Sequence, residues 1–342
     1  MNPKHLSTLL ERMIPARFPV LITGKPGVGK TDIGHAVTSK LGFELIVSHP
    51  VVSDPTDFKG LPWGINGGTE ATFLPFGELS RAINAVKPTV WFFDDLGQAS
   101  PAVQAACMQL FLARRINGHT LPDCVTFLGA TNRRADRAGV SGVLEPVKSR
   151  FVTIVELEPD INSWCNWAFD HAVSPMLIAF LRYRPTLLCD FQPTADLTNS
   201  PVPRTWANLA KLESLSLPAE IEAESFHGAV GEGAATEYLT FRAMANSLVN
   251  LDAILLDPSK VAIPTDVSQL YATVTGLARR ANANNFARIA TYATRLAVEA
   301  DRGEFAVLLV RDSERQDPKI AYTDSRIRLS CGPVGELYSG TK

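Results

Sequence analysis

The stretch GKPGVGKTDIGHA, from Gly24 to Ala36, matches the pattern G-x-x-x-x-G-K-S/T without a gap, with Gly29, Lys30 and Thr31 at its end. The apolar run PVLIT precedes it and a helical pattern follows it, which is the strand–loop–helix context of a phosphate-binding loop. Glycines let backbone N–H groups turn inward around a polyphosphate, and the N-terminus of the next helix adds a positive dipole end. The stretch therefore predicts a nucleotide site.

A second motif is VWFFDD, an apolar strand that ends in Asp94 and Asp95. In a phosphate-loop ATPase the first acid holds Mg²⁺ through water, and the second polarises the attacking water. Taken alone, an acidic pair is equally typical of a solvated turn after a strand. Its place about sixty residues after the phosphate loop favours the nucleotide site.

These two motifs predict most of the binding site. Lys30 would reach the β- and γ-phosphates of ATP, and the hydroxyl of Thr31 would ligate Mg²⁺ together with Asp94. The residues expected to bind the nucleotide are Gly24, Lys25, Pro26, Gly27, Val28, Gly29, Lys30, Thr31 and Asp94.

Three more residues are candidates for catalysis beside Asp95. Asn132 ends the run FLGATN, where a strand-terminal amide next to the γ-phosphate could orient the attacking water. Arg150 lies in PVKSRF before the last apolar run, and Arg204 lies in SPVPRTW. Each of them alone also fits a turn or surface residue. Because the three residues follow the phosphate loop and the acidic pair in this order along the chain, a role in the nucleotide site is favoured for them.

The first half of the chain alternates strand and helix patterns. Five short runs are almost continuously apolar, as strands of a parallel sheet covered on both faces must be; they span residues 19–23, 43–47, 90–93, 125–129 and 151–155. Between the first two, Ile33, Ala36 and Val37 predict the buried stripe of a helix, and Ser100-Pro101 predicts the start of another. The pattern indicates a parallel α/β fold, an αβα sandwich.

The second half shows helical spacing only, with a proline-rich irregular stretch from Pro185 to Pro203. We therefore predict a nucleotide-binding core over residues 1–158 and an all-α domain over 159–311. Residues 312–342 are polar and weakly periodic, and are predicted to be a partly disordered tail.

Composition excludes several classes of protein. The formal net charge is -2, so no global basic field attracts nucleic acid or an anionic membrane. The longest apolar runs, Met176 to Leu181 among them, are far shorter than a membrane span, and the charged, proline-containing start does not resemble a signal peptide. The five cysteines have no metal-binding spacing. We expect a cytoplasmic protein without membrane insertion.

Taken in order, the phosphate loop, the apolar strand with its acidic pair, the strand-terminal asparagine, SRF and PRTW resemble the AAA+ ATPases. More narrowly they resemble the MoxR family, over residues 18 to 310. DPTDFKGLPW, TFLPFGEL and QASPAVQAACMQLFLARRINGHTLPD are similar to that family's loop after the second strand, its helix insert and its hairpin before the first sensor.

The resemblance implies an ATP- and Mg²⁺-dependent ATPase with a helical lid, assembled as a homo-oligomeric and hexameric ring. It implies that Asn132 is the first sensor, that Arg150 is a finger reaching the neighbouring subunit's site, and that Arg204 is the second sensor. It also implies a chaperone-like role and a partner with a von Willebrand factor A domain.

One departure and two alternatives accompany this interpretation. The family usually has Asp-Glu where this chain has Asp94-Asp95, and the missing methylene shortens the reach by about 1.5 Å.

A DNA-handling motor or loader would share every nucleotide motif, although the near-neutral charge counts against nucleic acid. A GTP switch would need the guanine-reading N/T-K-x-D motif, and TNRRAD has arginine where that motif has lysine.

Overall fold

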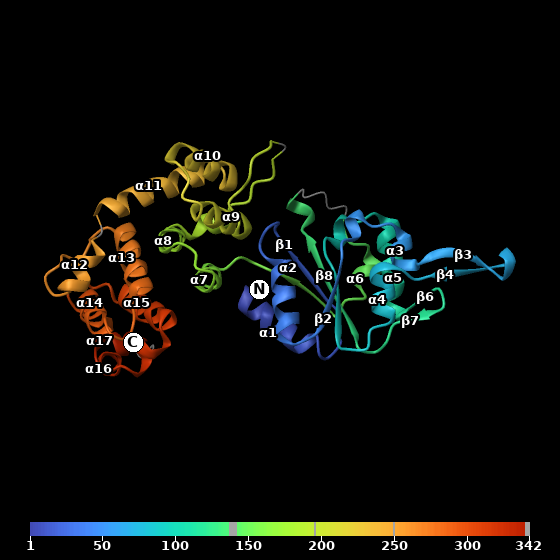
Figure 1. The fold of residues 1–342 in the computed structure, drawn as a ribbon, viewed down its shortest axis with the longest axis horizontal. Helices are drawn as coiled ribbons and strands as arrows, with labels where there is room; N and C mark the ends of the chain where they lie inside the picture. Colours follow the sequence, from blue (N-terminus) through green and yellow to red (C-terminus); the bar gives the residue numbers. More distant parts are fainter. Residues whose placement is uncertain (137–141, 195, 249, 339–342) are drawn as a thin grey trace. The chain divides into compact units, whose positions relative to one another are not determined.

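The computed structural model describes residues 1–136, 142–194, 196–248 and 250–338 of the 342-residue chain. The chain divides into two compact units (Figure 1). The first comprises Met1–Ser163 with Phe191–Leu197 and Val202–Arg204, and the second comprises Trp164–Asp190, Thr198–Pro201 and the chain from Thr205 onward.

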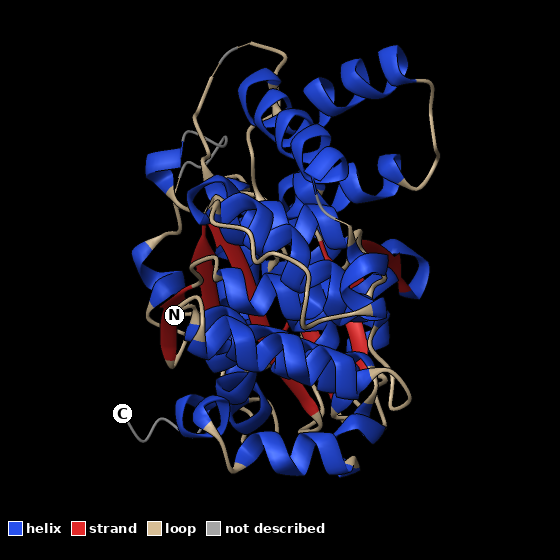
Figure 2. Cartoon of the chain, turned by 90° about the vertical axis from the view of Figure 1, so that its left-hand side faces the viewer, coloured by secondary structure: helices blue, strands red, loops and turns tan. Residues whose placement is uncertain are grey.

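All strands of the described residues precede residue 157, and Figure 2 shows them in red. They are β1 (Val20–Gly24), β2 (Glu44–Ser48), β3 (Leu61–Ile65), β4 (Glu70–Leu74), β5 (Thr89–Phe93), β6 (Arg115–Ile116), β7 (His119–Thr120), β8 (Val125–Asn132) and β9 (Thr153–Glu156). The helices of this part are α1 (Pro3–Met13), α2 (Lys30–Lys40), α3 (Pro55–Lys59), α4 (Gly77–Ile83), α5 (Pro101–Ala113) and α6 (Glu145–Lys148). Short 3₁₀ turns are η1 (Pro50–Val52), η2 (Asn66–Gly68), η3 (Leu96–Gln98) and η4 (Arg134–Asp136).

The five predicted apolar runs form one five-stranded sheet in the order β2-β5-β8-β1-β9, and every pairing in it is parallel. The predicted α/β fold with a five-stranded parallel sheet is confirmed. Since a parallel connection needs a crossover, helices cover both faces of this sheet.

Alternating side chains of β5 assign the helices to the two faces. Trp91 and Phe93 are fully buried in the cluster that includes Leu79 of α4 and Leu110 of α5. Phe92 points to the opposite face, where its ring lies 6.2 Å from that of His35 on α2. The sheet is therefore a central layer between α2 on one side and α4 and α5 on the other.

The buried face of α2 differs from the predicted stripe. Val37 is buried as expected, but Ala36 is exposed and Ile33 is only half-buried. Gly34 faces the sheet instead, so closely that a Cβ there would lie 3.1 Å from Leu128. The apolar pattern failed because close packing on the sheet selects a glycine, which carries no hydrophobic side chain.

Two antiparallel hairpins lie outside the main sheet. β6 and β7 fall in the stretch for which the family resemblance implied a hairpin. β3 and β4 project from the sheet domain in Figure 1 and leave Trp63 56% exposed. No strand was predicted here, because none of the side chains of β3 or β4 is buried enough to produce an apolar alternation.

The rest of the described chain is helical. Its helices are α7 (Ile161–Asp170), α8 (Pro175–Tyr183), α9 (Pro203–Glu213), α10 (Ala219–Val230), α11 (Glu232–Leu248), α12 (Leu251–Leu256), α13 (Val267–Arg280), α14 (Phe286–Val298), α15 (Gly303–Gln316), α16 (Asp324–Ser330) and α17 (Pro333–Tyr338), with 3₁₀ turns η5 (Pro185–Cys189) and η6 (Pro318–Tyr322). Gly231 ends α10 with a φ of 86°, so the glycine-rich stretch from Gly228 to Gly233 joins α10 to α11. None of the described helices is long and apolar enough to cross a membrane.

In place of the polar tail expected from Asp312 onward, residues up to 338 form the end of α15, η6, α16 and α17. Leu329 and Val334 are buried in the helical core with α13, α14 and α15. Asp312 is buried too, and its carboxylate pairs at 2.5 Å with Arg182. The prediction failed because a few well-spaced apolar residues anchor a segment whose other residues are polar.

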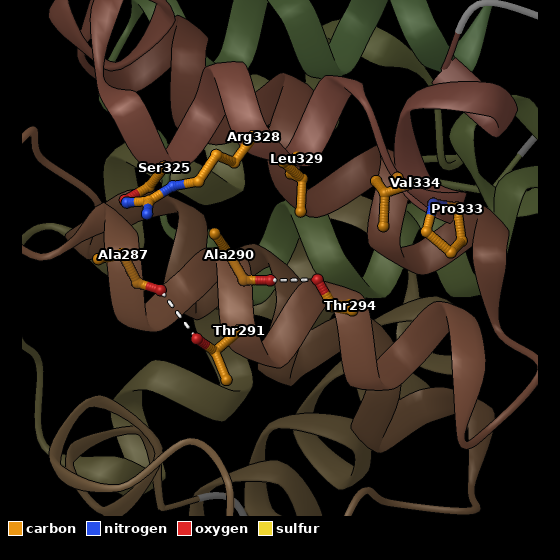
Figure 3. Close-up of a pocket in the computed structure, with 10 residues that line it drawn as sticks. Ala287, Ala290, Thr291, Thr294, Ser325, Arg328, Leu329, Pro333 and Val334 are labelled. Carbon is orange, nitrogen blue, oxygen red and sulfur yellow. Dashed lines mark hydrogen bonds between the residues drawn. The ribbon is translucent and has the colours of Figure 1, made fainter.

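The helical unit also contains a cavity of about 410 Å³ between α14, α16 and the start of α17 (Figure 3). Its walls are mainly small or apolar, with the hydroxyls of Thr291, Thr294 and Ser325 and the guanidinium of Arg328 as polar groups. Both threonine hydroxyls donate to carbonyl oxygens of their own helix.

A buried glutamine ties two loops of the sheet domain together. Gln104 of α5 is 0% exposed. Its Nε2 donates to the carbonyl oxygens of Ala99 and Gly142 at 3.1 and 2.9 Å, and its Oε1 accepts from the N–H of Leu144 at 2.9 Å. The segment after Asp95 is thereby joined to the segment that precedes α6.

Replacing Gln104 with alanine should lower the free energy of unfolding by roughly 3 kcal/mol, because it leaves buried backbone groups unpaired. Gln109, exposed on the same helix, is the matched control, and Gln109→Ala should change stability by less than about 0.5 kcal/mol. Urea unfolding of both variants measures the difference. Equal stability of the two variants would contradict the role of Gln104 in joining the two loops.

Candidate nucleotide-binding site

The topology of the sheet brings the sequence motifs together. β1 ends at Gly24, β5 ends just before Asp94, and β8 ends at Asn132. In the register of the sheet Gly24 pairs with Asn132, and Phe93 pairs with Gly129. Since parallel strands place their carboxyl ends at one edge, these motif residues meet where ligands of open α/β sheets bind.

The phosphate loop needs glycine at two positions for different reasons. A Cβ on Gly24 would lie 2.7 Å from the carbonyl oxygen of Leu157, which leaves no room for a side chain. Gly29 has a φ of 95° at the N-cap of α2, a left-handed conformation that other residues adopt only at a cost. The loop thus turns directly into the helix whose first residue is Lys30.

Lys30 is the electrostatic centre of the site. It is only 6% exposed, and its Nζ donates to the carbonyl oxygens of Gly24 and Lys25 at 3.0 and 2.9 Å and to Oδ1 of Asn132 at 2.7 Å. Burial lowers its pKa from 10.5 to about 8, although the negative charges of Asp95 and Asp94 oppose that shift. The ammonium group is therefore held in place before any phosphate arrives.

Thr31 and Asp94 provide a pair of oxygen donors. The Thr31 hydroxyl donates to Oδ2 of Asp94 at 2.8 Å, and Asp94 is 9% exposed. A hydroxyl and a carboxylate are ligands of the kind that Mg²⁺ prefers, so this donor set fits the cation. Among the residues that the structure describes, no group of three or more His, Cys, Asp or Glu side chains could hold a metal. The remaining ligands would therefore come from phosphate oxygens and water, as is usual for Mg²⁺.

Asp95 lies beside this pair in a left-handed conformation, with φ 57° and ψ 34°. Its Oδ1 accepts from Nε2 of Gln98 at 2.9 Å and from Nδ2 of Asn132 at 3.4 Å. Asn132 therefore contacts Lys30 through its oxygen and Asp95 through its nitrogen. Side-chain hydrogen bonds therefore connect Lys30, Asn132 and Asp95. The Thr31–Asp94 pair is joined to them through the backbone, because the N–H of Asp95 donates to Oδ1 of Asp94 at 3.1 Å.

The two candidate arginines have different surroundings. The backbone N–H of Arg204 donates to the carbonyl oxygen of Gly27 at 3.1 Å, and the charge of Arg204 contributes to the lowered pKa of Lys30. Arg204 is thus next to the phosphate loop. The guanidinium of Arg150 donates to the neighbouring Ser149 hydroxyl at 3.1 Å, and in the described chain no hydrogen bond joins Arg150 to another candidate residue.

One supporting group was not found from the sequence. Arg133 follows Asn132 and binds both carboxylate oxygens of the buried Asp136, at 2.9 and 2.7 Å, and the carboxylate of Glu156 at 2.7 Å. Its hydrogen bonds to Asp136 raise the pKa of the guanidinium. These pairs fix the end of β8 to that of β9. An arginine doublet in the sequence gives no sign of such a role.

Comparison with known proteins agrees with this geometry. Residues 20–158 match the model of the ATPase family associated with various cellular activities (AAA). The chain therefore contains an AAA-type ATPase domain, a nucleotide-binding fold with a phosphate-binding loop. A search of curated proteins found no match.

Two solved structures show more distant likeness. The Thermotoga maritima RuvB Holliday junction branch migration motor is 18% identical, with 73% of this chain and 78% of that chain covered and a TM-score of 0.41. NtrX from Brucella abortus in complex with ATP is 13% identical, with 97% and 67% covered and a TM-score of 0.43.

The lowered pKa of Lys30 predicts pH-dependent nucleotide binding. Phosphate charges favour the ammonium form and raise the pKa of Lys30 in the complex, so ADP affinity should be full below pH 8 and decline as the pH rises above it. Between the free and bound pKa values the loss approaches about tenfold per pH unit. Calorimetric titration with ADP, without divalent cations and in two buffers, would detect the accompanying proton uptake.

Lys30→Arg is the control, because a guanidinium does not titrate in this range. The variant should lose the pH dependence even if its affinity is lower. An ADP affinity of the wild type that stays constant from pH 7 to 9.5 would show that Lys30 remains protonated throughout.

Proposed function

We propose that this protein is an Mg²⁺-dependent ATPase that hydrolyses ATP to ADP and phosphate and works as a ring-forming, chaperone-like remodeller of a protein partner. The observation that carries the hydrolytic part is the continuous set of contacts from Lys30 through Asn132 to Asp95. It joins a group suited to bind phosphate with one suited to accept a proton.

In this proposal Lys30 binds the β- and γ-phosphates and neutralises charge that develops on the transferred phosphoryl group. Asp95 accepts the proton of the attacking water, through the oxygen not occupied by amide donors. Asn132 fixes the distance between these two groups because it bonds to both. When bound by Thr31 and Asp94, Mg²⁺ would add further neutralisation of the phosphates. Arg204, beside the phosphate loop, would sense the γ-phosphate.

Asp95→Asn tests the proton acceptor. The variant should keep nucleotide affinity, since Lys30, Thr31 and Asp94 are untouched, and lose about 10²–10⁴ in kcat because an amide cannot take the proton. Asp95→Glu restores the reach usual in the resembling family. A higher rate would mean that the aspartate is a slow base, and a lower rate that the loop is adapted to it. Hydrolysis by Asp95→Asn at the parental rate would remove Asp95 from the mechanism.

Arg150 is proposed to act on the site of a neighbouring subunit. Its only side-chain hydrogen bond in the described chain is local, and its Nε is buried without a hydrogen-bond partner there. The partner of the Arg150 guanidinium would therefore be supplied by another copy of the chain, as the family resemblance implies. The proposed ring, a hexamer by the same resemblance, would bring the two together.

Mixing variants tests this trans arrangement. Arg150→Ala should bind ATP but lose about 10³-fold or more in rate. Adding the Lys30→Ala variant, which cannot hydrolyse ATP itself, should restore part of the activity, since an intact site and an intact arginine then meet at one interface. Fluorescently labelled subunits would verify that mixed oligomers form. Mixed oligomers without restored activity would contradict the assignment.

The remodelling part of the proposal rests on the order of motifs that resembles the MoxR family, and on the β3–β4 hairpin, which exposes Leu61, Trp63 and Leu74 where a client could bind. A protein with a von Willebrand factor A domain is the proposed partner. Affinity purification from the native host identifies the partner. Tight DNA binding that weakens steeply with salt would favour the alternative, a DNA-handling motor.

A further inference from the structure

Gln98 occupies a place in the site that the sequence motifs do not assign. It ends η3, three residues after Asp95, and bonds back to that residue twice. The backbone N–H of Gln98 donates to the carbonyl oxygen of Asp95 at 3.0 Å, and its Nε2 donates to Oδ1 of Asp95 at 2.9 Å. The backbone bond closes the turn, and the side-chain bond holds the carboxylate.

The orientation of this amide follows from charge. With Nε2 toward Asp95, an N–H group meets an anionic oxygen; with the amide reversed, two oxygens would face each other. The orientation is kept although Oε1 of Gln98 is buried and has no hydrogen-bond partner among the described residues. Buried acceptors of this kind are uncommon and costly, so the contact with Asp95 dominates the placement of the side chain.

The result is an asymmetric carboxylate. Oδ1 of Asp95 accepts from two side-chain amides, those of Gln98 and Asn132, whereas no hydrogen bond to Oδ2 is found in the described chain. Two amides on one oxygen restrict rotation of the carboxylate, and they leave the other oxygen available to a water molecule. Because an aspartate has a shorter reach than a glutamate, such fixed orientation matters more here.

We propose that Gln98 is a positioning residue that aims Oδ2 of Asp95 at the attacking water. This inference rests on the proposed function, in which Asp95 is the proton acceptor. It concerns the orientation of the base and requires no contact between Gln98 and the nucleotide.

The test is steady-state ATP hydrolysis by Gln98→Ala and Gln98→Glu, with nucleotide affinity measured separately. Both variants should lose about 10–100-fold in kcat, because a misplaced base is costly, while KM and ADP affinity change by less than about twofold. Gln98→Glu keeps the size of the side chain but cannot donate and repels Asp95. Exposed Gln109→Ala is the matched control and should keep the parental kcat.

Asp95→Asn, alone and combined with Gln98→Ala, separates the two proposals. The double variant should be no slower than Asp95→Asn, since Gln98 acts through that carboxylate. A parental kcat in both Gln98 variants, with Asp95→Asn inactive, overturns the role of Gln98 and leaves the proposed function intact. A double variant slower than Asp95→Asn would also overturn the role of Gln98. A loss of nucleotide affinity equal to the loss in kcat would do the same. An Asp95→Asn variant with parental activity overturns both.

Discussion

A buried ammonium group dominates the organisation of this molecule. Taking Lys30 out of water is unfavourable, and the lowered pKa records that cost. Three oxygen acceptors and two nearby carboxylates offset it, and they come from separate parts of the chain that only the sheet brings to one place. The order of the strands, the tight loop at Gly24 and the end of β8 are all needed to surround one charge. The site is therefore a consequence of the topology rather than of the loop alone.

The parts of the fold that could be predicted are those in which burial leaves a pattern. Each strand of the main sheet is a short apolar run, and α5 begins at Pro101, as predicted, with Val103, Cys107 and Leu110 on its buried face. Prediction failed where burial was partial or absent. The β3–β4 hairpin has no buried side chain, and the segment after Asp312 is anchored by few apolar residues.

The same distinction applies to the candidate site. Lys30, Thr31, Asp94, Asp95 and Asn132 could be named from the sequence, since recurring patterns fix their spacing relative to the phosphate loop, and their proximity is now visible. Gln98, Gln104 and Arg133 could not, because no recurring sequence pattern marks them. Gln104 is specified by backbone groups of two loops, Arg133 by two carboxylates, and Gln98 by the orientation of the acid three residues before it. Gln104 did carry a signal: a polar residue inside the apolar face of α5 needs partners for both ends of its amide.

The two-stranded ribbon of β3 and β4 has a practical consequence for handling the protein. In the described part of the chain these strands pair only with each other, so backbone groups on their outer edges have no partner strand. The carbonyl oxygen of Phe73 in β4 is bonded instead to Nε2 of His119, at 2.7 Å. Apolar side chains such as Trp63 lie along the same ribbon. Such edges are templates for strand addition between molecules, so concentrated protein will self-associate through this ribbon unless another chain covers it. A lysine in the ribbon, in place of an exposed apolar residue, is the natural remedy for aggregation during purification.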